Sequence, residues 1–338
     1  CLAHQPWGLV TLTTREHGGF EHQRQPAATL ELHGANTIAQ TANTTTDAAA
    51  GKGAVHVSKA DTDSPDVTAK RLACFFRDVL DLKAIHWLTN PILSLHQALH
   101  ASNGRLRHRF GGKCAVVSSS GVLSAYEHGP SIDSAETVIR FNDAPVAGFE
   151  KLVGSRDDLR FVNMHFPRLV LQENKPVRPG VTYINMLTGD LPAFMDLVER
   201  RPGIDMYMAD SELWKPVAKA LREVFDESWF SIGMDGFRDY PSTGAMGMLA
   251  ALSMCDEVRA YGMAATNRDN WLYPYHYYGN RRGLKSGFAD NNTVHKSFEA
   301  EKHLWRLLAR NPTAVIDKTD VAVIPGFSHA VCPKRPMR

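Results

Sequence analysis

Residues 114–154 read CAVVSSSGVLSAYEHGPSIDSAETVIRFNDAPVAGFEKLVG, and this stretch predicts an α/β fold with a ligand site. It opens with an apolar run at 114–117 that is short and β-branched enough to form a buried strand, and 137–141 is a second such run. Each run ends in a polar loop, SSSG at 118–121 and ND at 142–143. Because the carboxyl ends of parallel strands form one edge of a sheet, the two loops indicate a nucleotide-type cleft.

The first loop has the composition of an anion site. Ser118, Ser119 and Ser120 offer three hydroxyls, and the flexible Gly121 leaves backbone N–H groups accessible. Asn142 adds a polar side chain at the end of the second strand. An ordinary polar turn is the alternative interpretation at both places.

The composition is typical of a soluble globular protein with material for one large domain. Of 338 residues, 43% are apolar and 22% are charged, and 38 basic residues nearly balance 36 acidic ones. A net charge of +2 gives no strong field to attract a polyanion, so no nucleic-acid partner is expected. No apolar run approaches the roughly 20 residues that span a bilayer.

Residues 1–68 differ from the rest of the chain. Most of this segment is rich in Ala, Thr, Gly and Asp and nearly free of aromatic residues. Such a composition buries too little apolar surface to offset its ordering entropy, which predicts a flexible stem. Residues 69–338 form the predicted folded domain.

The folded part begins with a predicted helix from residue 69, in which Leu72, Phe76, Val79 and Leu80 recur on one face. Strand-like and helix-like segments then alternate along the chain. This alternation predicts a mostly parallel sheet flanked by helices, with right-handed crossovers. The further predicted strands are 159–164, 181–187 and 204–208, and the further predicted helices are 191–200 and 212–225.

Residues 240–263, YPSTGAMGMLAALSMCDEVRAYGM, predict a buried helix whose amino end faces the cleft. Ser242 and Thr243 are good N-cap residues, and the run at 245–254 is almost wholly apolar. A helix N-terminus with adjacent hydroxyls and Gly244 can bind an anion through its N–H groups and its positive dipole end. The alternative is an ordinary capped core helix.

The order of residues in these two segments resembles the large and small sialylmotifs of the eukaryotic and viral-type sialyltransferase family. The first carries Cys-Ala-Val-Val-Ser-Ser-x-Gly, Gly-Pro-x-Ile-Asp and Val-x-Arg-Phe-Asn-x-Ala-Pro, and the second carries Pro-Ser-Thr-Gly, a helix and Cys-Asp-Glu-Val. The family transfers a sugar acid from a CMP-sugar, so the resemblance implies that activity and a GT-A-like, Rossmann-type α/β fold. The large motif is most similar to the branch that forms α2,6 links to galactose.

The cysteines gain meaning from the resemblance. In a cytosolic protein five cysteines would be reduced core residues. The resemblance instead implies a disulfide between Cys114 and Cys255, which joins the large and small motifs, and a second between Cys74 and Cys332. Cys1 is left unpaired.

Residues 273–279, YPYHYYG, resemble the short third sialylmotif. The resemblance implies that His276 assists the departing phosphate and that Tyr275 lies in the donor site. An aromatic cluster with one histidine is also common in protein cores, so this structural interpretation stays open.

Residues 295–301, HKSFEAE, resemble the very small sialylmotif, in which a histidine is followed by four residues and then by a glutamate. The resemblance implies that His295 is the catalytic base. Ala300 takes the place of the glutamate, with Glu299 and Glu301 on either side. The identity of the orienting glutamate therefore stays open.

The resemblance implies a single inverting displacement through an oxocarbenium-like state, without a metal ion or another cofactor. Hydroxyls, an imidazole and a helix N-terminus can stabilise the departing phosphate, and a histidine can take the acceptor proton near neutral pH. The sequence at 61–63, Asp-Thr-Asp, imitates a metal-binding Asp-x-Asp, but in the predicted stem it is attributed to chance. By family analogy, Ser118, Ser119, Ser120, Gly121 and Asn142 hold the nucleotide phosphate and ribose, and Ser242, Thr243 and Gly244 hold the donor carboxylate and sugar.

The implied partners are a CMP-sialic acid donor and a glycan acceptor on a glycoprotein or glycolipid. The implied location is the Golgi lumen, as a type II membrane protein whose N-terminal anchor lies outside this sequence. Asn43 and Asn291 begin glycosylation sequons, which matter in a secretory compartment.

The sequence is compared with three alternatives to sialic acid transfer, of which two stay open. CMP-Kdo or a related CMP-sugar acid is a possible donor, because the motifs bind CMP and the carboxylate more directly than the rest of the sugar. The altered spacing after His295 favours a non-catalytic relative that binds CMP or glycans. A nicotinamide-dependent Rossmann enzyme is disfavoured, because no Gly-x-Gly-x-x-Gly follows a strand.

Overall fold

The computed structural model describes residues 65–79, 85–88, 99–101, 110–186, 191–209, 241–265, 273–279 and 298–332, together with 217–218, 221–222 and 225. The predicted stem before residue 65, most of the predicted helix at 212–225, His295 and both sequons lie outside these residues. The stem boundary at residue 68 therefore stays a prediction.

The described residues form one nine-stranded sheet with the order β2-β1-β7-β6-β5-β4-β3-β8-β9. The strands from β7 to β8 are parallel, whereas β1, β2 and β9 run antiparallel at the two edges. The mostly parallel sheet predicted from the sequence is thus confirmed. The strands are β1 (Ile85–Leu88), β2 (Leu99–Ala101), β3 (Lys113–Val117), β4 (Thr137–Phe141), β5 (Leu159–Asn163), β6 (Thr182–Met186), β7 (Asp205–Ala209), β8 (Glu257–Tyr261) and β9 (Val321–Pro325).

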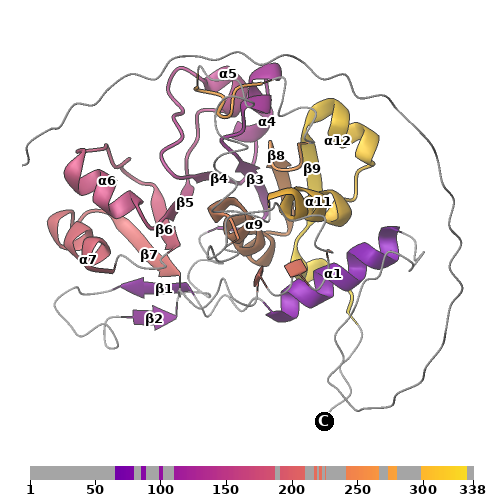
Figure 1. Cartoon of the computed structure of the whole chain (residues 1–338), viewed down its shortest axis with the longest axis horizontal. Coiled ribbons are helices and arrows are strands. Elements are labelled where there is room, and N and C mark those ends of the chain that lie inside the picture. The colour runs from indigo at the N-terminus through magenta and orange to yellow at the C-terminus, as the bar shows by residue number, and fades with distance from the viewer. Residues whose placement is uncertain are drawn as a thin grey trace, which may run out of the picture. The chain divides into compact units, whose positions relative to one another are not determined.

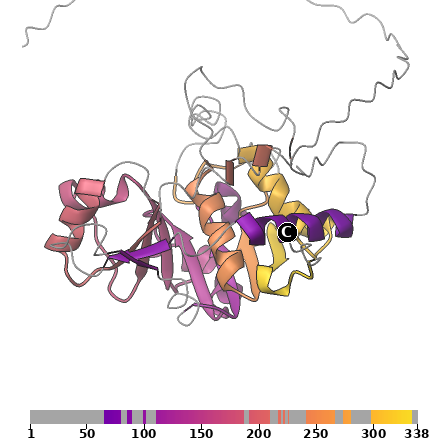
Figure 2. The same ribbon diagram turned by 90° about the horizontal axis from the view of Figure 1, so that it is seen from below.

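Helices cover both faces of this sheet. In Figures 1 and 2, α6 and α7 lie beside β5 to β7, and α1 and α11 lie toward β8 and β9. The helices are α1 (Pro65–Val79), η2 (Gly121–Ala125), α4 (Gly129–Asp133), α5 (Glu150–Val153), α6 (Phe166–Gln172), α7 (Leu191–Arg200), α9 (Thr243–Met254), α11 (Phe298–Leu308), α12 (Thr313–Thr319) and η6 (Phe327–His329).

The strand residues alternate between the cores on the two faces. In β3, Cys114 and Val116 belong to the core shared with α1, α9 and α11, whereas Ala115 and Val117 pack with η2, α4 and α5. Every residue of β4 is buried, Thr137 and Arg140 included. Burial on both faces is what a central parallel strand requires, and it explains the continuous apolar runs in the sequence.

The helix α9 is the centre of the largest core. It is apolar on all sides, and every residue from Ala245 to Met254 is buried. A Cβ atom at Gly247 would lie 2.5 Å from Cε1 of Phe141, so this glycine allows α9 to approach β4 closely. This close contact fixes the position of the amino-terminal half of α9 on one face of the sheet.

Candidate active site

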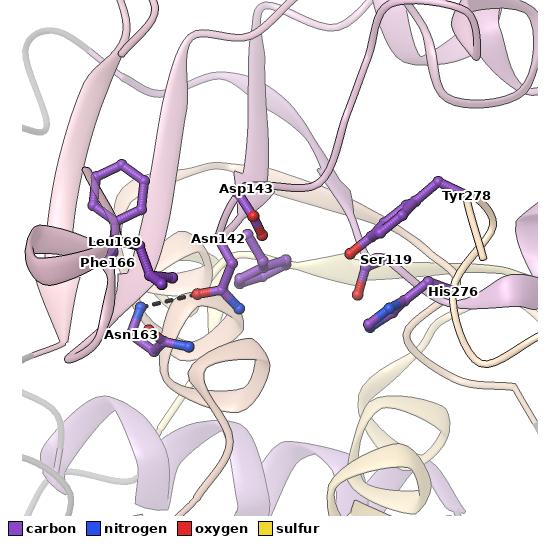
Figure 3. A pocket seen from close by; sticks show the side chains of 9 residues that line it. Ser119, Asn142, Asp143, Asn163, Phe166, Leu169, His276 and Tyr278 are labelled. Carbon is purple, nitrogen blue, oxygen red and sulfur yellow. Dashed lines mark hydrogen bonds between the residues drawn. The ribbon is translucent and has the colours of Figure 1, made fainter. Parts of the chain in front are cut away.

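The loop after β3 is folded largely by its own serines. The Ser118 hydroxyl donates to the Gly262 carbonyl at 2.9 Å and accepts from the Ser120 N–H at 3.0 Å. The Ser120 hydroxyl accepts from the Val122 N–H at 3.4 Å and caps η2. Ser119 is the one of these three serines that lines the cavity shown in Figure 3.

Residues 273–279 pair with this loop through their backbone. The Gly121 N–H donates to the Tyr275 carbonyl at 3.2 Å, and the Tyr277 N–H donates to the Ser119 carbonyl at 3.2 Å. These bonds place Ser120 opposite His276 in an isolated antiparallel bridge. The large motif and the third motif therefore form one unit, and His276 is positioned by it.

The loop after β4 presents Asn142 to the same cavity. Asn142 has a φ of +47°, in the left-handed region that asparagine tolerates better than most residues. Its side-chain Oδ1 accepts from the Asn163 N–H at 2.9 Å. The Nδ2 group therefore lies on the side of Ser119 and His276, where it can donate to a ligand (Figure 3).

A buried ion pair fixes the backbone of this loop. The Arg160 guanidinium donates to the carbonyls of Asn142 at 2.6 Å and Ala144 at 2.9 Å. The Asp157 carboxylate lies 2.7 Å from Arg160, and the two side chains are only 6% and 3% exposed. A second cation, Arg178, lies 3.0 Å from Asp157. The left-handed turn at Asn142 is thus fixed by a network that contacts its backbone.

The cavity lies at the carboxyl ends of β3, β4 and β5 and has a volume of about 230 Å³. It brings together three of the predicted site residues, which come from segments far apart in the sequence. Asp143, Asn163 and Tyr278 also line it and were not predicted as site residues, although Asn163 ends β5 as Asn142 follows β4. Its described lining consists of Ser119, Phe141, Asn142, Asp143, Asn163, Phe166, Leu169, His276 and Tyr278.

His276 lies between two tyrosine rings. Its ring centroid is 4.8 Å from that of Tyr278, nearly parallel at 13°, and 4.4 Å from that of Tyr275. Burial lowers the pKa of His276, and the nearby charge of Asp143 partly opposes that change. The imidazole is therefore mostly neutral at pH 7, with one N–H to donate and one nitrogen to accept.

The two following tyrosines have different roles in the fold. The Tyr277 hydroxyl donates to the Pro145 carbonyl, and its ring meets Phe149 edge-on at 5.2 Å. Burial raises the pKa of Tyr277 and of Tyr278 to about 12, so both keep their protons at neutral pH. Tyr277 joins this segment to the loop after β4, whereas Tyr278 lines the cavity.

The amino end of α9 is capped as the sequence predicts. The Ser242 hydroxyl accepts from the Ala245 N–H at 3.0 Å, and Ser242 also contacts the buried carboxylate of Glu301. Ser242, Thr243 and Gly244 are not among the described residues that line the cavity. The role of these residues in donor binding therefore stays a prediction.

The glutamates near His295 differ in burial. Glu301 is 4% exposed and reaches Ser242, whereas Glu299 forms an ion pair with Lys302 at 2.9 Å on a more open face of α11. Glu301 is thus the glutamate that connects α11 to α9. His295 itself lies outside the described residues.

Both expected disulfides are present. Cys114 of β3 is bonded to Cys255, which follows α9, and Cys74 of α1 is bonded to Cys332. The first bridge joins the beginning of β3 to the residue that follows α9, and the second joins the first described helix to the end of the described chain.

The described residues contain neither a membrane-spanning helix nor a metal-binding cluster. No helix there has the length and apolar character needed to cross a bilayer. In the same part of the chain, no group of three or more His, Cys, Asp or Glu side chains is arranged to hold a metal ion.

A mostly parallel sheet with helices on both faces, and a polar cavity at the carboxyl ends of its strands, defines a Rossmann-type α/β fold of the kind that binds nucleotides. The family model for glycosyltransferase family 29 (sialyltransferase) matches residues 60–313. The chain belongs to this family, as the sialylmotif resemblance implies.

Individual relatives are more distant. A protein of Mus musculus named CMP-N-acetylneuraminate-beta-galactosamide-alpha-2,3-sialyltransferase 2 is 31% identical over 202 residues, 59% of this chain and 54% of that protein. The beta-galactoside alpha-2,6-sialyltransferase 2 of Gallus gallus is 26% identical over 295 residues, 80% of this chain and 52% of that protein. The chain thus spans about half the length of these relatives. Because both linkages occur among them, the α2,6 expectation stays a prediction.

A solved structure is also similar. The crystal structure of a mammalian sialyltransferase in complex with Gal-beta-1-3GalNAc-ortho-nitrophenol aligns with a TM-score of 0.43 and 21% identity. The alignment covers 69% of this chain and 90% of that chain.

Proposed function

We propose that this chain transfers sialic acid from CMP-sialic acid to a terminal sugar hydroxyl of a glycan, by an inverting displacement without a metal ion. The observation that supports the proposal is the cavity that gathers Ser119, Asn142 and His276 in a member of family 29. All three can donate a hydrogen bond to a phosphate oxygen.

The departing group is the phosphate of CMP. As the bond between the sugar and the phosphate oxygen breaks, its electron pair goes to that oxygen and negative charge develops there. The Ser119 hydroxyl, the Asn142 Nδ2 group and the His276 N–H would stabilise this charge, since donors that are already in position need no reorganisation as the charge develops. Tyr275, which contacts the His276 ring, would keep the imidazole in place.

The amino end of α9 would hold the donor carboxylate and sugar. The Ser242 N–H already donates to Glu301. The Ser242 hydroxyl donates to Glu301 and accepts from the Ala245 N–H. The N–H groups of Thr243 and Gly244 belong to the first turn of α9, where a helix has no carbonyl partners of its own for them. Such N–H groups can bind an anion. Ser242 would thus hold the end of α9 in place, and Thr243 and Gly244 would bind the donor carboxylate.

The acceptor proton would go to His295. The acceptor hydroxyl oxygen attacks the anomeric carbon from the side opposite the phosphate, so the configuration inverts. His295 takes the hydroxyl proton as the new bond forms. The two disulfides suit an oxidising compartment, which supports the Golgi lumen as the location.

The test is to measure CMP release and glycan sialylation with CMP-sialic acid, and with CMP-Kdo in parallel. Replacing His295 or His276 by alanine should lower turnover by about 10²-fold. His329→Ala is the control, because this histidine is 57% exposed and lies in η6. Linkage-specific sialidases then identify the bond formed.

The outcomes separate the alternatives. Faster turnover of CMP-Kdo than of CMP-sialic acid would identify CMP-Kdo as the donor. A chain that binds CMP but releases no CMP from either donor would be a non-catalytic relative. Unchanged turnover in His295→Ala would remove this residue from the base role. A folded, oxidised chain that does not bind CMP would contradict the proposal as a whole.

A further inference from the structure

The cavity contains a carboxylate that the proposed chemistry does not use. Asp143 directly follows Asn142, lines the cavity and forms an ion pair with Lys175, which lies in the loop after α6. The side chains of Asp143 and Lys175 are 45% and 31% exposed. Among the described lining residues, Asp143 and His276 are the two that can carry a charge near neutral pH.

The carboxylate is ionised in this setting. Burial alone would raise the pKa of Asp143, but the hydrogen bond and charge of Lys175 outweigh burial and lower it, with a smaller effect from Arg160. The same hydrogen bond raises the pKa of Lys175. Glu173 lies 3.9 Å from Lys175 and is 56% exposed, so it weakly shares this cation.

A charge at this place affects any anion in the cavity. Because Asp143 is one of the lining residues, a phosphate bound in the cavity lies within about one Debye length of its carboxylate, roughly 8 Å at physiological salt. In partly solvated surroundings, one unit charge at that distance changes a binding constant by about 3- to 10-fold. Lys175 cancels much of this repulsion, because its ammonium group touches the carboxylate.

We propose that Asp143 and Lys175 are a charge-setting pair that limits the affinity of the cavity for the nucleotide monophosphate, so that CMP leaves after transfer. The inference rests on the proposed function, because it takes CMP as the ligand. Asp143 acts through its field and does not contact the ligand, and Lys175 determines how much of that field remains. Slow product release limits turnover in many enzymes, so an upper bound on CMP affinity has a functional consequence.

The proposal predicts opposite effects for the two partners. Asp143→Asn removes the repulsion and leaves Lys175 with only the more distant Glu173 carboxylate beside it, so CMP should bind about 3- to 10-fold more tightly. Lys175→Gln leaves the carboxylate uncompensated, so CMP should bind more weakly by a similar factor. The double variant lacks the residual repulsion as well as the cation, so CMP should bind it more tightly than the wild type but less tightly than Asp143→Asn. Loss of a merely structural ion pair would instead weaken binding, or leave it unchanged, in both single variants.

The experiment is isothermal titration calorimetry of the oxidised chain with CMP and with uncharged cytidine. The variants should change the affinity for CMP and leave that for cytidine unchanged, and 0.5 M salt should reduce the differences. Glu173→Gln is the matched control, because it removes the same charge from an exposed residue outside the described cavity lining and should change CMP affinity by less than about twofold. Circular dichroism during heating verifies that each variant is folded.

Several results would contradict the proposed role of Asp143 and Lys175. Weaker binding of both CMP and cytidine to Asp143→Asn would mean that Asp143 contacts the ligand, and an unchanged CMP affinity would mean that its field is too small. Equal effects of Glu173→Gln and Asp143→Asn would show a general surface-charge effect. A wild-type chain that binds no CMP would contradict the proposed function itself, whereas CMP binding with the wrong signs in the variants contradicts only the pair.

Discussion

Glu301 accepts two hydrogen bonds from Ser242, one from its backbone N–H at 2.8 Å and one from its hydroxyl at 2.5 Å. This contact joins α11, which begins within the very small motif, to the cap of α9 in the small motif. The sequence left the orienting glutamate open, because Ala300 stands at its expected place. The structure shows that Glu301 contacts Ser242, but His295 lies outside the described residues, so the choice between Glu299 and Glu301 as the orienting glutamate stays a prediction.

Replacing Glu301 by glutamine should destabilise the fold. The glutamine has one acceptor oxygen where the carboxylate has two, so one donor of Ser242 is left buried without an acceptor. The free energy of unfolding should fall by about 1–3 kcal/mol in urea titrations. Glu299→Gln is the control, because its ion pair with Lys302 is partly exposed and should contribute under about 1 kcal/mol. Equal losses in the two variants would contradict a special role of Glu301.

Replacing Gly121 by alanine should separate the two loops that form the cavity. A Cβ atom there would lie 1.6 Å from the Pro274 carbonyl oxygen, so the loops cannot keep their backbone pairing. The affinity for CMP should fall by at least about tenfold, because His276 is displaced with its segment. At Gly203 a Cβ atom meets nothing within 4 Å, and its φ is not positive, so Gly203→Ala should bind CMP normally. Normal CMP affinity in Gly121→Ala would show that the pairing is dispensable.

The central strands could be predicted from the sequence because each is a short apolar run with polar ends. The predicted limits of β4 and α7 agree with the structure to the residue. The edge strands β1 and β2 were missed because they have only four and three residues, and the antiparallel β9 was missed because its partner β8 lies far earlier in the sequence. The helix α1 begins at Pro65, before the predicted start at residue 69, because proline suits the first turn of a helix.

The site residues that could be predicted are those recognisable from their own segment of sequence. Ser119, Asn142 and His276 each follow a strand end or lie in a motif, and the structure brings them to one cavity. Contacts between segments gave no such signal: Lys175 meets Asp143 across 32 positions. Arginine in a strand normally suggests exposure, yet Arg140 is 1% exposed and donates to the Val153 carbonyl at 2.6 Å. Its partners are backbone carbonyls, which sequence patterns do not reveal.

Removing the disulfide between Cys114 and Cys255 should affect both stability and binding. The bridge closes a loop of 141 residues, and its loss in Cys114→Ala/Cys255→Ala should lower the free energy of unfolding by about 4–5 kcal/mol in the chain-entropy model. CMP affinity should also fall, because Cys114 lies four residues before Ser118. The matched double variant of Cys74 and Cys332 should lose comparable stability and keep its CMP affinity at 10 °C. Equal CMP affinity in both double variants would separate the first bridge from the site.

Mild acid should destabilise the chain through His128. Its Nε2 atom is buried without a hydrogen-bond partner, and its ring stacks on Tyr126 at a centroid distance of 5.0 Å. Burial lowers the pKa of His128 below 6.5, against the opposing hydrogen bond with the Thr319 backbone. The unfolded chain therefore binds a proton at a higher pH than the folded chain does.

The free energy of unfolding should consequently be largest above pH 6.5 and fall as the pH drops through the folded-state pKa. His276 and His303, whose pKa values burial also lowers, contribute in the same direction. His128→Asn keeps a short donor side chain and removes the titrating group, so its urea-unfolding free energy should change less between pH 7.5 and 5.5 than that of the wild type. An equal or steeper loss in the variant would assign the acid sensitivity to other groups, because the orphaned Nε2 atom would then carry none of it.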